Sequence, residues 1–331
     1  MSRPRQRLLP FFLPMQGCPD HCVYCDQRSI SGRSQPPDPE EVRRALDCFA
    51  PDSQAELAYY GGSFTCLPRQ AQERWLDLAA PYIRRGVVGG VRISTRPDAV
   101  DGEVCAFLRR HGVTTVELGV QSFHDAVLER SGRSCRQADS RRACAAVREA
   151  GLRLGVQLMT GLPGDTPALS RDSLEQALEL KAELLRFYPV LVLEGTELAR
   201  RWRAGDYRPQ SLREAVELTA DLLERAEAAG ATVQRMGLNP GPELEAALLA
   251  GPYHPAFGGL VREEVCFRRA CALLEAAGAG AGPCRLRCAS ADLAQVVGQR
   301  RQGLLRLRER FPGLSVAVDP DLAPGELGAE V

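Results

Sequence analysis

Three cysteines near the start of the chain, Cys18, Cys22 and Cys25, stand at Cys-x3-Cys-x2-Cys spacing on one predicted loop. Iron–sulfur clusters are held by cysteine thiolates, whereas a zinc site usually has four protein ligands. Three thiolates on a four-iron cluster leave one iron open to another ligand. A zinc site with His21 as the fourth ligand is the alternative. His21 adjoins Cys22 and is poorly placed to close the same tetrahedron, so the spacing favours a cluster.

The remaining cysteines are expected to be free thiols. No charged-then-apolar signal peptide opens the chain, and it has no run of about 18 apolar residues. We therefore expect the reducing cytoplasm and no membrane partner. A second cluster on Cys266, Cys271, Cys284 and Cys288 stays open, although the Cys-x4-Cys and Cys-x3-Cys spacings are loose. Buried apolar thiols are the favoured interpretation.

Composition limits the class of protein. The chain has 331 residues, 44% of them hydrophobic, which suffices for one large domain and a small one. The formal net charge is zero, so no overall field attracts nucleic acid or a membrane surface. Lys181 is the single lysine among 42 basic residues, and one arginine is therefore weaker evidence for a binding site than usual.

Segments typical of strands alternate with helical segments at roughly 30-residue spacing, which predicts a parallel α/β sheet. A dinucleotide-binding fold would need Gly-x-Gly-x-x-Gly after an early strand, which Gly61-Gly62-Ser63-Phe64 does not supply. We predict a partial, open (β/α)6 barrel. Helices are expected over 212–228 and over 124–150, the latter with a break near Gly132. The expected strands are 8–13, 55–60, 90–95, 114–118, 152–159, 184–193 and 232–236.

The segment from Gly17-Cys18-Pro19 to Tyr24-Cys25 resembles the cluster loop of radical S-adenosylmethionine (SAM) enzymes. The resemblance implies a 4Fe-4S cluster whose open iron chelates the amine and carboxylate of SAM. It also implies the partial barrel and an electron donor such as flavodoxin or ferredoxin. Reductive cleavage of SAM to a 5′-deoxyadenosyl radical is the implied chemistry.

Candidate cofactor-binding residues follow the second and third predicted strands, at the end where barrel enzymes carry their chemistry. Gly61 and Gly62 let the backbone approach a ligand closely. In the resembling enzymes such a glycine turn meets the methionine amine. Arg96 can pair with a carboxylate in a bidentate way, and the alternative is a surface ion pair with Asp98.

The fourth and fifth strands supply further candidates. Glu117 and Gln121 can bond the ribose hydroxyls or groups around the methionine carboxylate, whereas Ser122 can cap the next helix. Gln157 lies on the fifth strand, and Leu162 lies in an apolar turn that resembles the one packed on adenine in the family. Taken alone, Leu162 would be read as a core residue.

Further blocks resemble a narrower group, that of the elongator catalytic subunit, which starts the modification of wobble uridine in transfer RNA. Anaerobic coproporphyrinogen enzymes share part of the pattern. The resemblance covers about residues 8–265 and implies an RNA substrate. Its blocks are Gln16–Pro19, Ser94–Asp98, Gly155–Thr166, Tyr188–Leu198, Gly205–Tyr207 and His254–Gly258.

Two features depart from that group. Arg133-Ser134-Cys135 stands where the group has Arg-Gly-His, so no role of that histidine carries over. The elongator subunit also continues into an acetyltransferase domain, for which a chain ending at Val331 leaves no room. We therefore expect an elongator-like enzyme without that domain, and we do not carry over carboxymethyl transfer from acetyl-CoA.

The C-terminal residues are expected to form a separate module. We predict a core over 1–265, a helix and hinge over 266–282, and a βααβ module with an acidic tail over 283–331. The βααβ order resembles a KH module, in which the turn between the helices clamps a nucleic-acid backbone. Gly298, Arg300 and Arg301 in this turn are the candidate RNA contacts, although Arg301 departs from the Gly-x-x-Gly pattern.

The module is predicted to be basic. Between Pro283 and Phe311, seven arginines face only Asp292 and Glu309. A small cap over the barrel without RNA binding is the alternative.

Three functions follow from the sequence. The first is a radical SAM enzyme that modifies RNA, most simply transfer RNA. The second keeps the radical chemistry but acts on a tetrapyrrole or another metabolite. The third is an RNA-binding protein with a structural or redox-sensing cluster.

Overall fold

The computed structural model describes residues 7–13, 18, 22–33, 35–49 and 55–331. Contacts divide the chain into two compact units. Unit 1 holds residues 1–211 and 226–253, and unit 2 holds 212–225 and 254–331. The sequence placed the core boundary at 265. Among the described residues, no helix is long and apolar enough to cross a membrane.

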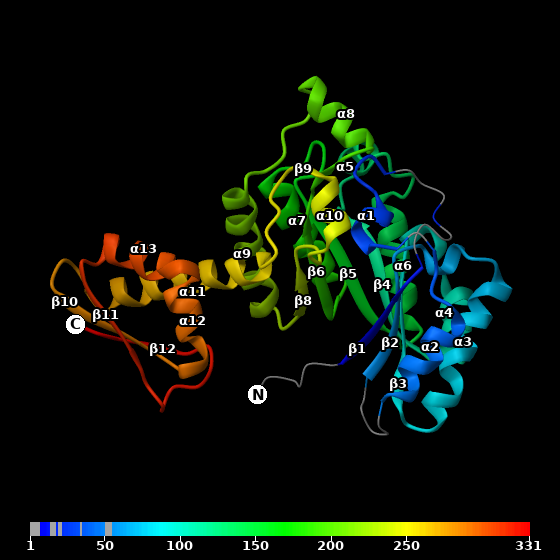
Figure 1. Ribbon diagram of the computed structural model, residues 1–331, viewed down its shortest axis with the longest axis horizontal. Helices are drawn as coiled ribbons and strands as arrows, with labels where there is room; N and C mark the ends of the chain where they lie inside the picture. Colours follow the sequence, from blue (N-terminus) through cyan, green and yellow to red (C-terminus); the bar gives the residue numbers. More distant parts are fainter. Residues whose placement is uncertain (1–6, 14–17, 19–21, 34, 50–54) are drawn as a thin grey trace. The chain divides into compact units, whose positions relative to one another are not determined.

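Unit 1 is built on a seven-stranded parallel sheet whose strands lie side by side in chain order, β1-β2-β3-β4-β5-β6-β8 (Figure 1). Within the described part of the chain β1 and β8 do not pair, so the barrel is open, as predicted. The strands are β1 (Leu8–Phe12), β2 (Ala55–Tyr60), β3 (Val88–Thr95), β4 (Val113–Gln121), β5 (Arg153–Thr160), β6 (Leu184–Pro189) and β8 (Thr232–Met236).

Helices follow the strands, and several of them pack against the sheet. The predicted break near Gly132 is confirmed, because α5 and α6 are separate helices. The helices of unit 1 are α1 (Gln27–Ser31), α2 (Pro39–Asp47), α3 (Arg69–Arg84), α4 (Gly102–Arg110), α5 (Asp125–Arg130), α6 (Gln137–Glu149), α7 (Pro167–Glu179), α8 (Glu197–Ala204) and α10 (Pro242–Ala247). The next helix in the chain, α9 (Leu212–Ala228), belongs mostly to unit 2.

The predicted strand over 184–193 is wrong at its end. Beyond Pro189 the backbone leaves the main sheet, and β7 (Val192–Leu193) pairs with β9 (Leu248–Ala250) in a small antiparallel sheet. Local sequence favours a strand throughout, but the partner of its last residues lies more than fifty residues away along the chain.

The two faces of the main sheet differ in chemistry, because successive side chains of a strand point to opposite faces. Tyr59 faces the helices, where its hydroxyl donates to the carbonyl of Trp75 in α3. Glu56 and Tyr60 face the other way, into the half-barrel. There they meet Arg92 and Arg186 from β3 and β6, so the interior is polar and charged.

Unit 2 combines one long helix with a three-stranded sheet of order β11-β10-β12. The predicted βααβ order is present, and its relation to KH modules stays a prediction. The elements are α11 (Phe257–Ala276), β10 (Pro283–Cys288), α12 (Leu293–Val297), α13 (Gln302–Arg310), β11 (Gly313–Val318) and β12 (Leu327–Glu330).

The structure adds two features to this unit. The first is that α11 begins at Phe257, which is buried with Val261 and Val265 along one helix face. The second is that the acidic tail contains β12, which pairs antiparallel with β10.

Candidate active site

The second half of the cysteine loop is fixed by backbone hydrogen bonds. The amide of Cys25 donates to the carbonyl of Cys22 at 2.9 Å. Val23 donates to the carbonyl of Ser131 at 3.0 Å and accepts from the amide of Leu198 at 2.7 Å. Two segments distant in sequence therefore hold this loop in place. His21, the alternative zinc ligand, lies outside the described residues, as do 14–17, 19 and 20.

The three thiols lie close enough to affect one another. Burial, and then the thiols of Cys22 and Cys18, raises the pKa of Cys25 to about 12. Ionising this set needs cationic compensation, which iron ions supply to cysteine ligands. Among the described residues, no three His, Cys, Asp or Glu side chains converge closely enough to hold a single metal ion.

Arg133 places a buried positive charge beside these thiols. Its Nη2 donates to the carbonyl of Gly119 at 2.6 Å, and its Nη1 lies 3.7 Å from the sulfur of Cys22 and 3.4 Å from the hydroxyl of Tyr24. Burial alone would lower the pKa of Arg133, but Tyr24 and the thiols of Cys22 and Cys135 outweigh it and raise that pKa.

The Nε of Arg133 is buried without a hydrogen-bond partner in the described structure, which also gives the guanidinium no carboxylate partner. An unmatched buried cation costs free energy unless an anion lies beside it. A thiolate-bound cluster supplies that anion, so the residues present fit a 4Fe-4S cluster. The sequence did not single out Arg133 as a site residue, although it is the arginine that matches the Arg-Gly-His of the resembling group, because it lies 111 positions from Cys22.

The glycine turn after β2 has the expected backbone freedom. Gly61 adopts φ +96°, which side-chain-bearing residues rarely reach, and a Cβ there would meet the backbone of Leu13 at 3.5 Å. Beyond Gly62, the Ser63 hydroxyl bonds Thr95 at 2.9 Å and accepts from the amide of Arg96 at 3.2 Å. The ends of β2 and β3 are thus tied together beneath the turn.

Arg96 makes the ion pair that was the alternative to ligand binding. Its Nε and Nη2 donate to the two carboxylate oxygens of Asp98 at 2.5 and 2.7 Å, and Nη2 also donates to the hydroxyl of Ser134 at 2.6 Å. The side chain of Arg96 is 6% exposed. Its guanidinium is therefore committed within the chain and positions the Ser134 segment next to Arg133.

Glu117, like Arg96, has its charge paired within the chain. One carboxylate oxygen accepts from Arg92 at 2.7 Å and from Arg186 at 3.0 Å, and the other lies 3.0 Å from the Nε of Arg186. The carboxylate thus meets two guanidinium groups inside the half-barrel, an arrangement that favours a structural role over contact with ribose.

Gln121 and Gln157, predicted on neighbouring strands, are brought together. The Nε2 of Gln157 donates to the Oε1 of Gln121 at 3.1 Å. Gln121 also has φ 69°, in the left-handed region. Such a conformation costs a non-glycine residue about 1 kcal/mol or more and is enriched at functional sites. These two amides keep their candidacy as ligand contacts.

The turn after β5 packs against the cysteine loop. Leu162 is 2% exposed and shares an apolar cluster with Val23 and Tyr24, and Cys22 and Cys25 contact the same cluster. The hydroxyl of Tyr207 donates to the carbonyl of Gly161 at 2.7 Å and fixes the turn. Leu162 is therefore a core residue beneath the candidate cofactor site.

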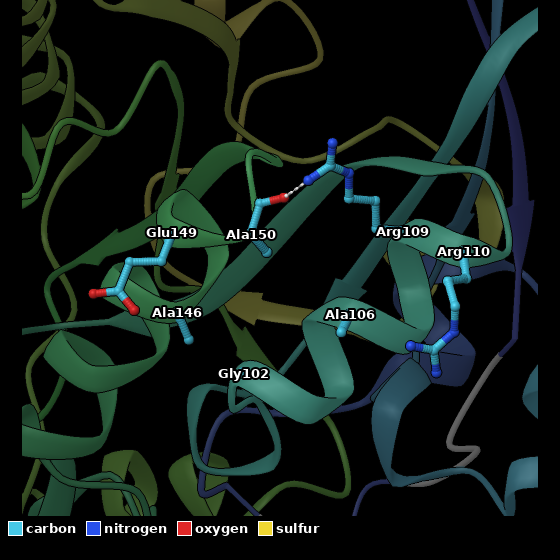
Figure 2. A pocket seen from close by; sticks show the side chains of 7 residues that line it. All are labelled: Gly102, Ala106, Arg109, Arg110, Ala146, Glu149 and Ala150. Carbon is cyan, nitrogen blue, oxygen red and sulfur yellow. Dashed lines mark hydrogen bonds between the residues drawn. The ribbon is translucent and has the colours of Figure 1, made fainter.

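A groove of about 600 Å³ between α4 and α6 belongs to another part of unit 1 (Figure 2). The hydrogen bond drawn in it, from Arg109 to the carbonyl of Ala150 at 2.9 Å, joins α4 to the end of α6. The groove holds none of the predicted site residues and no metal-ligating cluster. Its lining is Gly102, Ala106, Arg109, Arg110, Ala146, Glu149 and Ala150.

The four cysteines considered for a second cluster lie instead in the apolar core of unit 2. Cys266, Cys271, Cys284 and Cys288 are each at most 8% exposed and pack with Leu274, Leu286 and Val296. Burial raises the pKa of Cys266 to about 11, and it also raises the pKa values of Cys271 and Cys288, which disfavours thiolates. The favoured interpretation as buried thiols agrees with this placement.

The turn between α12 and α13 keeps two exposed arginines. Arg300 and Arg301 have φ of 50° and 64°, and the described structure gives neither a carboxylate partner. Gly298 has a local reason to be glycine, because a Cβ there would lie 2.7 Å from the amide nitrogen of Gly303. Gly298 thus allows the helices to approach each other.

The predicted net positive charge of the module is largely neutralised. Arg285 and Arg287 pair with Glu330 of β12, and Arg306 and Arg310 pair with acids of α11. The sequence window between Pro283 and Phe311 missed these acids because they lie outside it.

Comparisons with known proteins agree with this geometry. Residues 12–177 match the radical SAM superfamily, and residues 182–266 match the radical SAM C-terminal domain. The chain therefore belongs to the radical SAM superfamily. Its enzymes use a 4Fe-4S cluster and SAM, and this chain is an enzyme of that kind. When bound, these cofactors supply a 5′-deoxyadenosyl radical that abstracts a hydrogen atom.

Individual relatives point to an elongator-like group. The chain is 28% identical over 244 residues to the tRNA uridine(34) acetyltransferase of Dehalococcoides mccartyi, covering 62% of this chain and 53% of the relative. It is 27% identical over 198 residues to the heme chaperone HemW of Lactococcus lactis, covering 59% and 52%.

Among solved structures, the archaeal Methanocaldococcus infernus Elp3 shares the fold with a TM-score of 0.63 and 21% identity, covering 78% of this chain and 62% of that one. The chain spans about half or less of the length of the first curated relatives it matches.

Proposed function

We propose that this enzyme modifies a nucleoside in transfer RNA by radical SAM chemistry. The cysteine loop with its buried Arg133 supports the cofactor assignment, and the similarity to tRNA uridine(34) acetyltransferases supports the substrate. Cys18, Cys22 and Cys25 hold the cluster in this proposal. Gly61 and Gly62 lie against the methionine end of SAM.

Other residues of the chain complete the cofactor site. Gln121 and Gln157 offer amide groups to the ribose, and Leu162 supports the adenine turn from below. In this proposal the enzyme works in a reducing cytoplasm, where flavodoxin or ferredoxin would deliver the electron.

The RNA itself has a proposed contact in unit 2. Arg300 and Arg301 are exposed and lack a carboxylate partner in the described structure, so they can meet phosphates without breaking an ion pair. This contact is the part of the KH-like proposal that the observed geometry favours most.

Anaerobic reconstitution tests the chemistry. The wild-type protein should bind about four irons per chain and release 5′-deoxyadenosine under dithionite. Cys22→Ser should abolish both, whereas Cys48→Ser, at an exposed cysteine, should change neither. Zinc in place of iron, or an intact cluster without release, would contradict the proposal.

A metabolite substrate is the second candidate, favoured by the similarity to the heme chaperone HemW. The two candidates separate by adding either unfractionated tRNA or heme to the reconstituted enzyme. Binding of tRNA with stimulated release supports the first candidate. Binding of heme, with no response to tRNA, supports the second.

A further inference from the structure

The last strand of the half-barrel carries a bulge that redirects a side chain. In the parallel pair of β6 and β8 the register shifts after Leu185, so Arg186 lies opposite Arg235 and Gln234 is the extra residue. The Oε1 of Gln234 accepts from Arg92 at 2.5 Å inside the half-barrel. Bulges re-aim side chains and are enriched next to active sites. Here the bulge places Arg235 opposite Arg186 in the register of the two strands, within range of the charges of Arg186 and Tyr188.

The interior charges do not balance once Arg235 is included. Arg92 meets Glu56 and Glu117, and Arg186 meets Glu117 again. Two carboxylates thus face two guanidinium groups, and Arg235 adds a third. This group of interior side chains carries one unmatched positive charge, located toward the carboxyl end of β8.

The hydrogen-bonding capacity of Arg235 is mostly unused. A guanidinium has five N–H donors, and only the Nε of Arg235 has a partner among the described residues, the carbonyl of Gly237 at 3.0 Å. Those residues place no carboxylate within ion-pairing distance of it. The side chain is half-buried, and burial together with the charge of Arg186 lowers the pKa of Arg235 although Tyr188 opposes the shift. The unused N–H donors and the lowered pKa of Arg235 both agree with the lack of a counter-ion among the described residues.

Tyr188 adds a further donor at the same place. Its hydroxyl oxygen accepts from the Nη1 of Arg186 at 3.3 Å, and its hydroxyl hydrogen has no acceptor in the described structure. The two Nη groups of Arg235 and the hydroxyl of Tyr188 therefore offer N–H and O–H donors from adjacent strands. Planar donor forks of this kind suit carboxylate and phosphate oxygens.

We propose that Arg235, with Tyr188 and Arg186 beside it, binds an oxyanion of the molecule on which the radical acts. The site lies at the open edge of the half-barrel, toward the same end of the sheet as the cysteine loop that follows β1. The proposal rests on the proposed function for its substrate. The oxyanion is either a backbone phosphate of the RNA or a carboxylate or phosphate of a small substrate.

The test compares Arg235→Met and Arg235→Lys with Arg148→Met, an exposed arginine of α6 that serves as the matched control. Dissociation constants for unfractionated tRNA are measured from low to moderate salt, and those for inorganic phosphate and for acetate by thermal shift. A second measurement uses the wild-type holoenzyme alone. Phenylglyoxal labelling of Arg235, resolved by peptide mass spectrometry, is compared with and without each probe.

We expect Arg235→Met to weaken binding of one probe at least tenfold, Arg235→Lys to recover part of it, and Arg148→Met to change nothing. If the oxyanion belongs to RNA, tRNA protects Arg235 from labelling and the salt slope of the Met variant falls by about 0.7. If it belongs to a small substrate, phosphate or acetate protects and tRNA binding is unchanged.

The proposal is overturned if no probe protects Arg235 in the wild type and the Met variant binds every probe as tightly as the wild type. Basal release of 5′-deoxyadenosine without RNA should stay within about twofold of wild type in the control Arg148→Met, which lies outside the proposed site. Absence of release from the wild type would instead refute the proposed function, and the labelling result would still decide on Arg235.

Discussion

Arginines meet carboxylates in both units of this protein, but under opposite conditions. In the half-barrel Arg92 is fully buried, and Glu56 and Glu117 are 2% and 5% exposed. In unit 2 the pair of Arg310 and Glu275 is about half exposed on both sides. The same kind of ion pair therefore stabilises the buried interior in unit 1 and lies on the surface in unit 2. With Lys181 as the only lysine, position rather than residue type separates structural from ligand-binding cations.

The largest expected effect on stability comes from removing Arg92, which pairs with Glu56 and Glu117 inside the half-barrel. Arg92→Met should lower the free energy of unfolding by about 3–5 kcal/mol, because two buried carboxylates lose their shared partner. Anaerobic urea unfolding followed by circular dichroism measures it. A loss under 1 kcal/mol would show that water enters the half-barrel and that the comparison between the units is false.

Low pH should reduce the difference in free energy of unfolding between the wild type and Arg92→Met. Burial opposes ionisation of Glu56, but the charge and hydrogen bonds of Arg92, with Thr115 and Thr114, outweigh it and hold its pKa below the ordinary value. A depressed carboxyl pKa contributes stability above the unfolded value of about 4.3, and this stability is lost as pH falls through the folded pKa. The gap between wild type and Arg92→Met should therefore shrink below about pH 4. A gap that widens there would contradict this assignment.

The next largest expected effect is that of replacing Arg133. This residue is buried like Arg92, but it faces thiols instead of carboxylates. Arg133→Met should make the cluster harder to reduce, since a positive charge beside Cys22 stabilises the added electron. We expect the midpoint potential without SAM to fall by on the order of 100 mV, from a unit charge at close range in a partly screened site. Redox titration followed by electron paramagnetic resonance measures it, and an unchanged potential would place the guanidinium away from the cluster.

Exposed arginines should affect binding without affecting stability. Replacing both Arg300 and Arg301 with alanine should reduce the salt slope of tRNA binding by about 1.4, while the free energy of unfolding stays within about 0.5 kcal/mol. Arg269→Ala on α11 is the surface control. An unchanged slope would remove unit 2 from the RNA-binding proposal.

The smallest expected effect on the free energy of unfolding comes from breaking an exposed ion pair in unit 2. Arg310→Met removes a half-exposed ion pair, and such pairs contribute about 0–1 kcal/mol. Urea unfolding, compared with that of Arg92→Met, measures it. A cost near that of Arg92→Met would show that the two units do not differ as described.

The sequence predicted the parallel half-barrel well, because strand-like segments alternate with helical segments at roughly 30-residue spacing. It did not reveal β12, a four-residue strand, Leu327–Glu330, that depends on pairing with β10. It also did not reveal Arg133 or Arg235. One depends on a tertiary contact with Cys22 and the other on a register shift between β6 and β8. The sequence shows that an arginine can bind an anion, but only the packing shows whether its partner is a group of the protein itself.

The hydrogen bonds that hold Val23 to Ser131 and Leu198 have one more consequence. They come from protein alone, so we expect this half of the loop to keep its shape when iron is lost to oxygen. Metal and sulfide could then be reinstalled on a folded polypeptide, which would repair the inorganic centre without degrading and resynthesising the enzyme.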